Sequence, residues 1–367
     1  MRVLALIPNQ KGYSPGQRGS IELWEKILTP AGIEVVYEPF ETELLRSILY
    51  KPGHYAQKAV GMIKAYADRI QLVRDLDHFD AVFVYREAAL LGPAFLERMI
   101  ARKKPIIYQL DDPLFVPYRS PSNGLLSYLK FFGKIKRIVQ ISTAVIVNST
   151  PILEFASPHN SNIWQVPSVV DTDKFTYDER DQLTDPPCIG WSGSQTTVKN
   201  IKMVEEVLRH FSREGSCRIS LIGSDDFGLT NVNHTAKKWD AETEVDELRK
   251  IHIGLVPLPD DNPWNPYKFI MKTAQYMALG IVPVGTSMAS NTEVIRHGEN
   301  GFLADTEAEW IEYLSRLVHD RELRLKLSRA AVIDAAAKYS LQANAQKIIA
   351  AFRSVSGNQL PRASARG

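Results

Sequence analysis

The sequence predicts an α/β protein built from two doubly wound, Rossmann-like domains that face each other across a cleft. Short apolar runs rich in Val and Ile alternate with segments of helical periodicity, and the alternation starts afresh after a polar stretch. Alternation of this kind gives right-handed β-α-β units and open parallel sheets. The length of 367 residues is enough for two such domains. Open sheets bind ligands beyond the carboxyl ends of their strands, so we expect the site in the cleft.

The first domain is expected to span residues 1–170. In its first helix, Ser20 is placed to cap the N-terminus, and Ile21 and Trp24 mark the apolar face. Residues 171–187 are polar and end in two prolines, which is typical of an interdomain connection. Five apolar runs are expected as buried strands: 2–8, 80–86, 105–110, 143–149 and 162–167.

The second domain is expected over residues 188–340, followed by a C-terminal helix and a flexible tail over 341–367. Helices are expected from about 197 to 212 and near 240–250. Its strands are expected at five further apolar runs: 188–191, 217–223, 251–258, 281–286 and 301–304.

The segment 267–286 of the second domain is the most informative part of the chain. It reads as a short amphipathic helix, a left-handed stop at Gly280 and a buried strand. Lys268, Lys272 and Gln275 are spaced i, i+4 and i+7, so they are expected on one helical face. Two cations and an amide suit an anionic ligand that carries hydroxyl groups, although a plain solvated face is the alternative.

The composition of the chain indicates a soluble globular protein. The chain is 44% hydrophobic and 23% charged, as in soluble globular proteins, and its net charge of +2 gives no reason to expect a nucleic-acid partner. No run of about twenty apolar residues suggests a transmembrane helix, and the N-terminus is expected as a strand rather than a signal peptide. Cys188 and Cys217 are expected as buried free thiols, with a disulfide less well supported. These features indicate a cytoplasmic protein.

A turn at residues 192–194 could bind an anion. Ser192, Gly193 and Ser194 follow an apolar run and precede a helix, so backbone N–H groups and the positive helix end could hold a diphosphate. Lys199 in the first turn of that helix could reach the same anion. The spacing is not that of a P-loop, and an ordinary strand-to-helix turn is the alternative.

The loop 13–24 in the first domain could lie near the same ligand. Gly16 and Gly19 would permit close backbone approach, and Ser20 follows them directly. Arg18 could add positive charge on the acceptor side, although a solvated arginine is an equal alternative.

Carboxylates follow one of the expected strands directly. Asp111 and Asp112 come after the run 105–110, where they could accept hydrogen bonds from sugar hydroxyls or position an acceptor nucleophile. The alternative is that one of them caps a turn. Arg86 and Glu87 end the preceding strand and could point into the same space, or they could form a local salt bridge.

Three further segments have a functional and a structural interpretation. Trp239 could stack on a nucleotide base or pack in the core. Asp171 and Asp173 spell an Asp-x-Asp triplet, but no other metal-ligand cluster supports it, so we expect no metal site. Residues 125–140 mix aromatic, aliphatic and basic side chains and could rest on an anionic membrane, although an ordinary helix packed on the sheet is the alternative.

Three motifs in the second half resemble those of retaining glycosyltransferases with the GT-B architecture, of the group 1 or family-four type. VPSVVDTDKF is similar to the hinge-side signature of this family. KTAQYMALGIVPVGT is similar to its Lys-Leu-Leu-Glu-Tyr-Met-Ala-x-Gly-x-Pro-Val-Val segment, and NTEVIRHGENGFLA to its closing segment, which contains Glu293. The resemblance runs over most of residues 1–350.

The resemblance implies that the first domain binds the acceptor and the second binds the nucleotide-sugar donor. Lys199 matches the family lysine that contacts the diphosphate. Gly19 and Ser20 stand where the family has a loop near the donor phosphates, and Asp111 with Asp112 stands where many members contact the donor sugar.

Two departures from the family pattern concern the donor. Many members carry two glutamates eight positions apart, where this chain has Tyr267 and Gln275. An amide is a weaker acceptor for ribose hydroxyls than a carboxylate. The usual arginine of the phosphate loop is replaced by Trp191, and Lys268 could supply the missing cation.

The sequence therefore predicts a metal-independent, retaining glycosyltransferase without a cofactor. It would move a sugar from a nucleoside-diphosphate sugar to a hydroxyl of a glycan, a lipid-linked or a small-molecule acceptor, as in polysaccharide biosynthesis. A non-catalytic nucleotide-sugar-binding protein and a nucleotide-sugar epimerase of the same fold are the alternatives.

Overall fold

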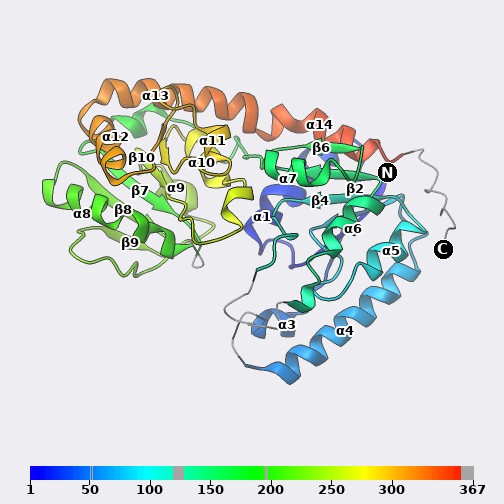
Figure 1. Ribbon diagram of the computed structural model, residues 1–367. Coiled ribbons are helices and arrows are strands. Elements are labelled where there is room, and N and C mark those ends of the chain that lie inside the picture. The colour runs from blue at the N-terminus through cyan, green and yellow to red at the C-terminus, as the bar shows by residue number, and fades with distance from the viewer. Residues whose placement is uncertain (50, 52, 119–127, 195–196, 357–367) are drawn as a thin grey trace. The chain divides into compact units, whose positions relative to one another are not determined.

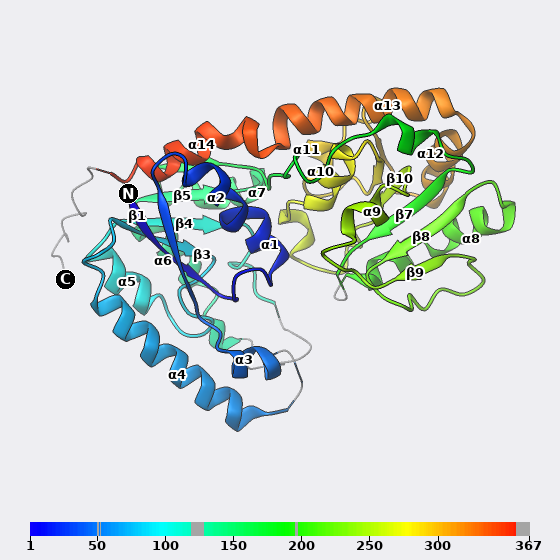
Figure 2. The same cartoon turned by 180° about the vertical axis from the view of Figure 1, so that it is seen from behind.

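The computed structural model describes residues 1–49, 51, 53–118, 128–194 and 197–356. They form two compact units: Met1–Pro167 with Asn344–Gly367, and Ser168–Ala343. Each unit contains a six-stranded parallel sheet, shown in Figures 1 and 2. The predicted α/β class with two Rossmann-like sheets is confirmed. Among the described residues, every helix is too short or too polar to span a bilayer.

The first unit has the strand order β2-β1-β3-β4-β5-β6, which is that of a doubly wound sheet. Four of its strands are buried over nearly their whole length because helices cover both faces. The strands are β1 (Arg2–Ile7), β2 (Glu34–Pro39), β3 (Ala81–Tyr85), β4 (Ile106–Leu110), β5 (Ala144–Val147) and β6 (Ile163–Gln165).

The helices of the first unit include one long element, α4, which packs beside α3 and α5 (Figure 1). The helix expected after Ser20 begins earlier, and Ser20 lies inside a π-helical stretch with non-helical backbone angles, so its expected role as a cap is wrong. The helices are α1 (Pro15–Gln17), the π-helix Arg18–Glu22, α2 (Leu23–Leu28), α3 (Glu43–Ile48), α4 (Tyr55–Arg74), α5 (Phe95–Ala101), α6 (Lys134–Ile141) and α7 (Thr150–Ala156).

The second unit has the strand order β12-β11-β10-β7-β8-β9. Its apolar core lies on both faces of the sheet, and Trp191, Phe211 and Trp310 are among its largest buried side chains. The strands are β7 (Cys188–Ser192), β8 (Arg218–Ile222), β9 (Thr235–Lys237), β10 (Ile253–Val256), β11 (Val282–Gly285) and β12 (Phe302–Leu303).

The helices of the second unit differ from expectation at two places. The helix expected over 197–212 is a 3-10 helix followed by an α-helix, and the helix of the 267–286 motif begins only at Met271. The elements are the 3-10 helices Glu179–Leu183, Val198–Val204 and Asn265–Tyr267, the helices α8 (Glu205–Glu214), α9 (Glu244–Leu248), α10 (Met271–Ala278), α11 (Asn291–Val294), α12 (Glu307–His319) and α13 (Arg321–Asp334), and the π-helix Ala335–Tyr339.

Two segments differ from the expected domain boundaries in the unit to which they belong. Residues 171–187 lie within the second unit. The last helix, α14 (Leu341–Arg353), starts in the second unit and continues into the first, where Phe352 contacts Trp24 of α2. Figure 2 shows α14 next to α2.

The two cysteines are free thiols. Cys188 packs in the core cluster around Met277, whereas Cys217 packs against the other cluster of the same unit. Burial raises the pKa of the Cys188 thiol to about 11. Both therefore behave as small apolar residues.

Candidate functional site

A turn at the carboxyl end of β7 is held in place by α10. The Ser192 N–H donates to the Tyr276 hydroxyl at 2.7 Å, and the Gly193 N–H donates to the Ile222 carbonyl at 2.9 Å. A Cβ on Gly193 would lie 2.3 Å from the Trp191 ring, so only glycine fits there. These two N–H groups are used within the protein, which differs from the expectation that they face a diphosphate. They fix the turn, and Ser194 after it is exposed.

Lys272 is the most unusual cation of this region. Its Nζ lies over the Trp191 ring, 4.4 Å from the ring centroid. Burial, and then the charge of Lys268, lower the pKa of Lys272 to about 7. Among the residues that the structure describes, no carboxylate forms an ion pair with it. A cation held without a counter-ion in an apolar setting attracts an anion strongly.

Lys268 lies close enough to lower the pKa of Lys272. The two lysines are close although they do not share one helical face, which was the prediction. Lys268 is extended (ψ 138°) and precedes α10, so it does not share a helical stripe with Lys272 and Gln275. The 3-10 helix Asn265–Tyr267, which contains Pro266, delays the start of the α-helix. Lys272 and Gln275 do share a face of α10, at i and i+3, and both are partly buried.

Lys199 lies on the 3-10 helix that follows the β7 turn, as the sequence predicts. Its Nζ forms an ion pair with Asp261 at 3.0 Å, and both side chains are 58% exposed. A pair this exposed contributes about 0–1 kcal/mol, so a ligand phosphate could replace Asp261 at little cost.

The positions of three other segments of the second unit that were considered for a ligand or metal site do not point to one. Trp239 packs against a core cluster and donates to Glu244 Oε1 at 3.0 Å, which corresponds to its packing alternative. Glu293 is exposed on α11, and the structure gives no direct test of its role. Asp171 and Asp173 belong to no group of three or more metal-ligating side chains among the described residues.

In the first unit, Arg86 and two carboxylates meet at the carboxyl ends of β3 and β4. Arg86 binds Asp111 through two nitrogens, at 2.7 and 2.9 Å, and Asp112 at 2.6 Å. The Tyr85 hydroxyl also donates to Asp111, at 2.5 Å. The structure thus brings Arg86, Asp111 and Asp112 together, as the sequence suggested. The alternative, a local salt bridge of Arg86 with Glu87, is not what the structure shows, because Glu87 pairs with Lys134.

The glycine loop of the first unit lies against the same cluster. A Cβ on Gly16 would be 2.6 Å from the Tyr85 hydroxyl and 3.2 Å from Asp111 Oδ2. Arg18 and Gly19 are partly buried in the π-helix after it. Ser20 is buried, and its hydroxyl donates to the Gln17 carbonyl at 3.3 Å.

Glu87 does not point into this space. Its carboxylate forms a buried ion pair with Lys134 of α6, at 2.8 Å. Lys134 also donates to the Ala89 carbonyl, and Glu97 accepts the Ala88 N–H. Burial raises the pKa of Glu97 in spite of the nearby lysine. Glu87 therefore anchors the chain after β3.

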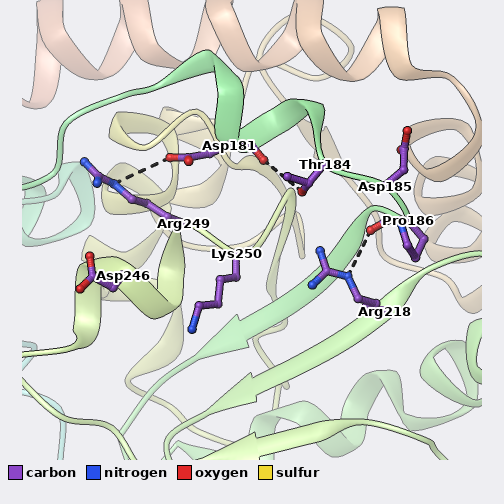
Figure 3. A pocket seen from close by; sticks show the side chains of 8 residues that line it. All are labelled: Asp181, Thr184, Asp185, Pro186, Arg218, Asp246, Arg249 and Lys250. Atoms are coloured by element: carbon purple, nitrogen blue, oxygen red, sulfur yellow. Dashed lines mark hydrogen bonds and ion pairs between the residues drawn. The ribbon is translucent and has the colours of Figure 1, made fainter.

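A cavity of about 560 Å³ lies elsewhere in the second unit. Pro186 and Arg218 place it at the amino ends of β7 and β8, where Arg218 Nε donates to the Pro186 carbonyl at 3.2 Å (Figure 3). Lys272 and the β7 turn lie at the opposite edge, at the carboxyl ends of the strands, where ligands of open parallel sheets bind. The cavity is therefore separate from the candidate site. Its lining consists of Asp181, Thr184, Asp185, Pro186, Arg218, Asp246, Arg249 and Lys250.

Sequence reasoning missed several residues that shape these sites. Trp191 was noted only as a departure from the family pattern, yet its ring supports Lys272. Tyr276 was not singled out, although it holds the β7 turn. Tyr85 and Lys134 were also missed as partners of Asp111 and Glu87, because such long-range pairs leave no local sequence signal.

Comparison with known proteins finds a family match within the second unit. Residues 186–320 match the family described as "Glycosyl transferases group 1". A search of curated proteins finds no match.

Solved glycosyltransferase structures share the fold over nearly the whole chain. HepE of Anabaena in complex with UDP-glucose has a TM-score of 0.68 at 14% identity, covering 96% of this chain and 100% of that one. Sucrose-phosphate synthase of Thermosynechococcus elongatus has a TM-score of 0.71 at 13% identity, covering 96% and 98%. A glycosyltransferase of Rickettsia africae has a TM-score of 0.64 at 13% identity, covering 98% and 99%. Residues 186–320 thus match the group 1 glycosyltransferase family, and the chain shares the fold of these glycosyltransferase structures.

Proposed function

We propose that the protein transfers a sugar from a nucleoside-diphosphate sugar to an acceptor hydroxyl, without a metal and with retention of configuration. The observation that supports this most is Lys272, a cation that has no counter-ion among the described residues and lies beside the β7 turn. A diphosphate would supply the missing negative charge. HepE, which shares the fold, was solved with UDP-glucose.

In the proposed reaction, the bond between the anomeric carbon and the leaving phosphate breaks while the acceptor oxygen bonds to that carbon on the same face. The leaving phosphate takes the acceptor proton. Lys272, Lys268 and Lys199 would stabilise the charge that develops on this phosphate, and stabilisation of this kind commonly contributes most to catalysis. Gln275, on the same face of α10 as Lys272, would accept a hydrogen bond from a ribose hydroxyl. Asp111 and Asp112 would contact sugar hydroxyls.

The acceptor would be a glycan, a lipid-linked or a small-molecule hydroxyl compound. A lipid-linked acceptor requires contact with a membrane, and part of the segment 125–140 lies outside the described residues. Within the rest, Tyr128, Leu129 and Phe131 are exposed, whereas α6 buries Ile135 and Ile138 in the core. Absence of co-sedimentation with anionic vesicles would remove membrane contact from the proposal.

A Lys272→Met variant tests the role of the central cation. Thermal shift of the wild-type protein against UDP-, GDP- and ADP-linked sugars first identifies the donor, because a bound donor stabilises the folded state by mass action. We expect Lys272→Met to lose the shift and to lower transfer on the order of 10²-fold or more. Lys199→Ala is expected to lose less binding, because this lysine is 58% exposed and water screens its charge.

The matched control is Lys326→Met, on α13 of the same unit. It removes one positive charge from an exposed position and should leave the donor shift unchanged. If Lys272→Met bound and turned over the donor like the control, the diphosphate role of Lys272 would be wrong. Donor binding without any transfer or conversion would favour the non-catalytic alternative, and conversion of the donor alone would favour an epimerase.

A further inference from the structure

The chain turns sharply after β3, and this turn aims Arg86. Arg86 has a φ of +65°, a left-handed conformation that residues with a side chain rarely adopt. The Glu87 N–H donates to the Tyr85 carbonyl at 2.8 Å, and the Arg86 N–H donates to the Gln109 carbonyl at 2.9 Å. Neighbouring side chains therefore leave the strand in different directions: Arg86 toward Asp111, and Glu87 toward Lys134.

The guanidinium of Arg86 ties two adjacent carboxylates into one fixed arrangement. It holds both oxygens of Asp111 and one oxygen of Asp112, with side-chain exposures of only 9% and 21% for these two residues. Burial alone would lower the pKa of Arg86, but Asp111 and Asp112 raise it well above its ordinary value. Arg86 is therefore positively charged in this arrangement.

Other contacts prevent this arrangement from shifting. Asn148 donates to the Asp111 carbonyl at 3.1 Å, and the Tyr85 hydroxyl holds the Asp111 side chain. A Cβ on Gly16 would lie 3.0 Å from Arg86 Nη2, so the glycine loop closes one side. The buried pair of Glu87 and Lys134 fixes the other end of the turn. Such a set of contacts is what a rigid site requires.

We propose that Arg86 is a positioning residue that holds the Asp111 and Asp112 carboxylates in the geometry that accepts hydrogen bonds from a sugar hydroxyl. The inference rests on the proposed function. Two neighbouring carboxylates repel each other, and the guanidinium removes that repulsion while its planar fork fixes the orientation of Asp111. Arg86 acts through these carboxylates rather than on the reacting atoms.

Arg86→Gly separates the guanidinium from the backbone, because glycine adopts the left-handed turn without strain. We expect kcat for transfer to fall on the order of 10²-fold, the cost of a small misplacement at a reacting centre. The donor-induced thermal shift should be reduced but not lost, because the contacts of Lys272 with the diphosphate remain while the sugar hydroxyls lose well-placed acceptors. Guanidinium ion at tens of millimolar should restore part of kcat, and Arg86→Lys should stay impaired because lysine lacks the bidentate fork.

A double-mutant cycle tests whether Arg86 acts through the carboxylates. In an Asp111→Asn, Asp112→Asn background, Arg86→Gly should lower kcat little further. Additive losses, a normal kcat in Arg86→Gly, or lost donor binding would each overturn the inference. If Arg86→Gly does not fold, Arg86→Lys with a normal kcat would also overturn it.

The failure of this inference differs from the failure of the proposed function. In the first case, the wild-type protein transfers sugar and the Arg86 variants do so equally well. In the second, the wild-type protein shows no turnover of any nucleoside-diphosphate sugar.

Discussion

At the residue scale, the two candidate sites handle positive charge in opposite ways. Arg86 is neutralised by two carboxylates, at 2.7 and 2.6 Å, whereas Lys272 lies over an aromatic ring and has no carboxylate partner in the described part of the chain. The ion pairs of Arg86 hold its side chain and the carboxylates in place. The charge of Lys272 is not balanced by a carboxylate, so an anionic ligand can balance it. Lys272 therefore reduces the stability of the free protein, as residues at binding sites commonly do.

The lowered pKa of Lys272 predicts how the free energy of unfolding changes with pH. The pKa of Lys272 is about 7 in the folded protein, below its ordinary value of 10.5. Between these values the unfolded chain holds a proton that the folded chain has lost, so stability rises with pH in this window. The slope for one proton is about 1.4 kcal/mol per pH unit.

We therefore expect Lys272→Met to stabilise the free protein at pH 7, and to do so less at pH 9. Urea unfolding of both proteins at pH 7, 8 and 9 measures the difference between their free energies of unfolding, which removes the contribution of other titrating groups. A difference that is constant over this range would contradict the lowered pKa of Lys272.

At the element scale, buried strands with continuous apolar runs are predictable from the sequence, because helices on both faces impose that pattern. The strands β2 and β9 are partly buried edge strands that include charged side chains, so they lack the continuous apolar run by which the other strands were predicted. The start of α10 was misplaced by four residues because the turn at Pro266 overrides helical periodicity. Asp111 and Asp112 could be placed at a strand end, but their long-range partners could not.

Gly280 was predicted to end its helix in a left-handed conformation, and its φ of +73° confirms this. Gly215 ends α8 in the same way, with a φ of +72°. The two differ in their surroundings: a Cβ on Gly280 would lie 2.3 Å from the Tyr177 ring, whereas a Cβ on Gly215 would meet nothing within 4 Å.

Gly215→Ala should therefore cost only the backbone strain, about 1 kcal/mol of stability. Gly280→Ala should cost about 2–4 kcal/mol, because overpacking adds to the same strain. Urea unfolding of the two variants measures this difference. Equal losses would show that the contact with Tyr177 relaxes without cost.

At the scale of the whole molecule, the order of the chain and the division into units do not coincide. The first unit takes its last residues from Asn344 onward, after the whole second unit. Ile348, Ala351 and Phe352 of α14 are fully buried there, and Phe352 stacks on Phe83 of β3 at 5.5 Å. A sequence pattern can predict this C-terminal helix but not the sheet whose core it completes, because only tertiary contacts define that assignment.

Phe352→Ala should consequently destabilise the first unit, although the residue lies near the C-terminus. Removing a buried phenylalanine costs about 3–5 kcal/mol, because apolar contacts with Trp24 and Phe83 are lost and a cavity forms. Native-state hydrogen exchange should show faster opening of β1 and β3, with β7 and β10 unchanged. Gln346→Ala, an exposed position on the same helix, is the matched control and should change neither set. Equal loss of protection in both units would show that they unfold as one cooperative body, and that α14 stabilises the whole chain rather than the first sheet.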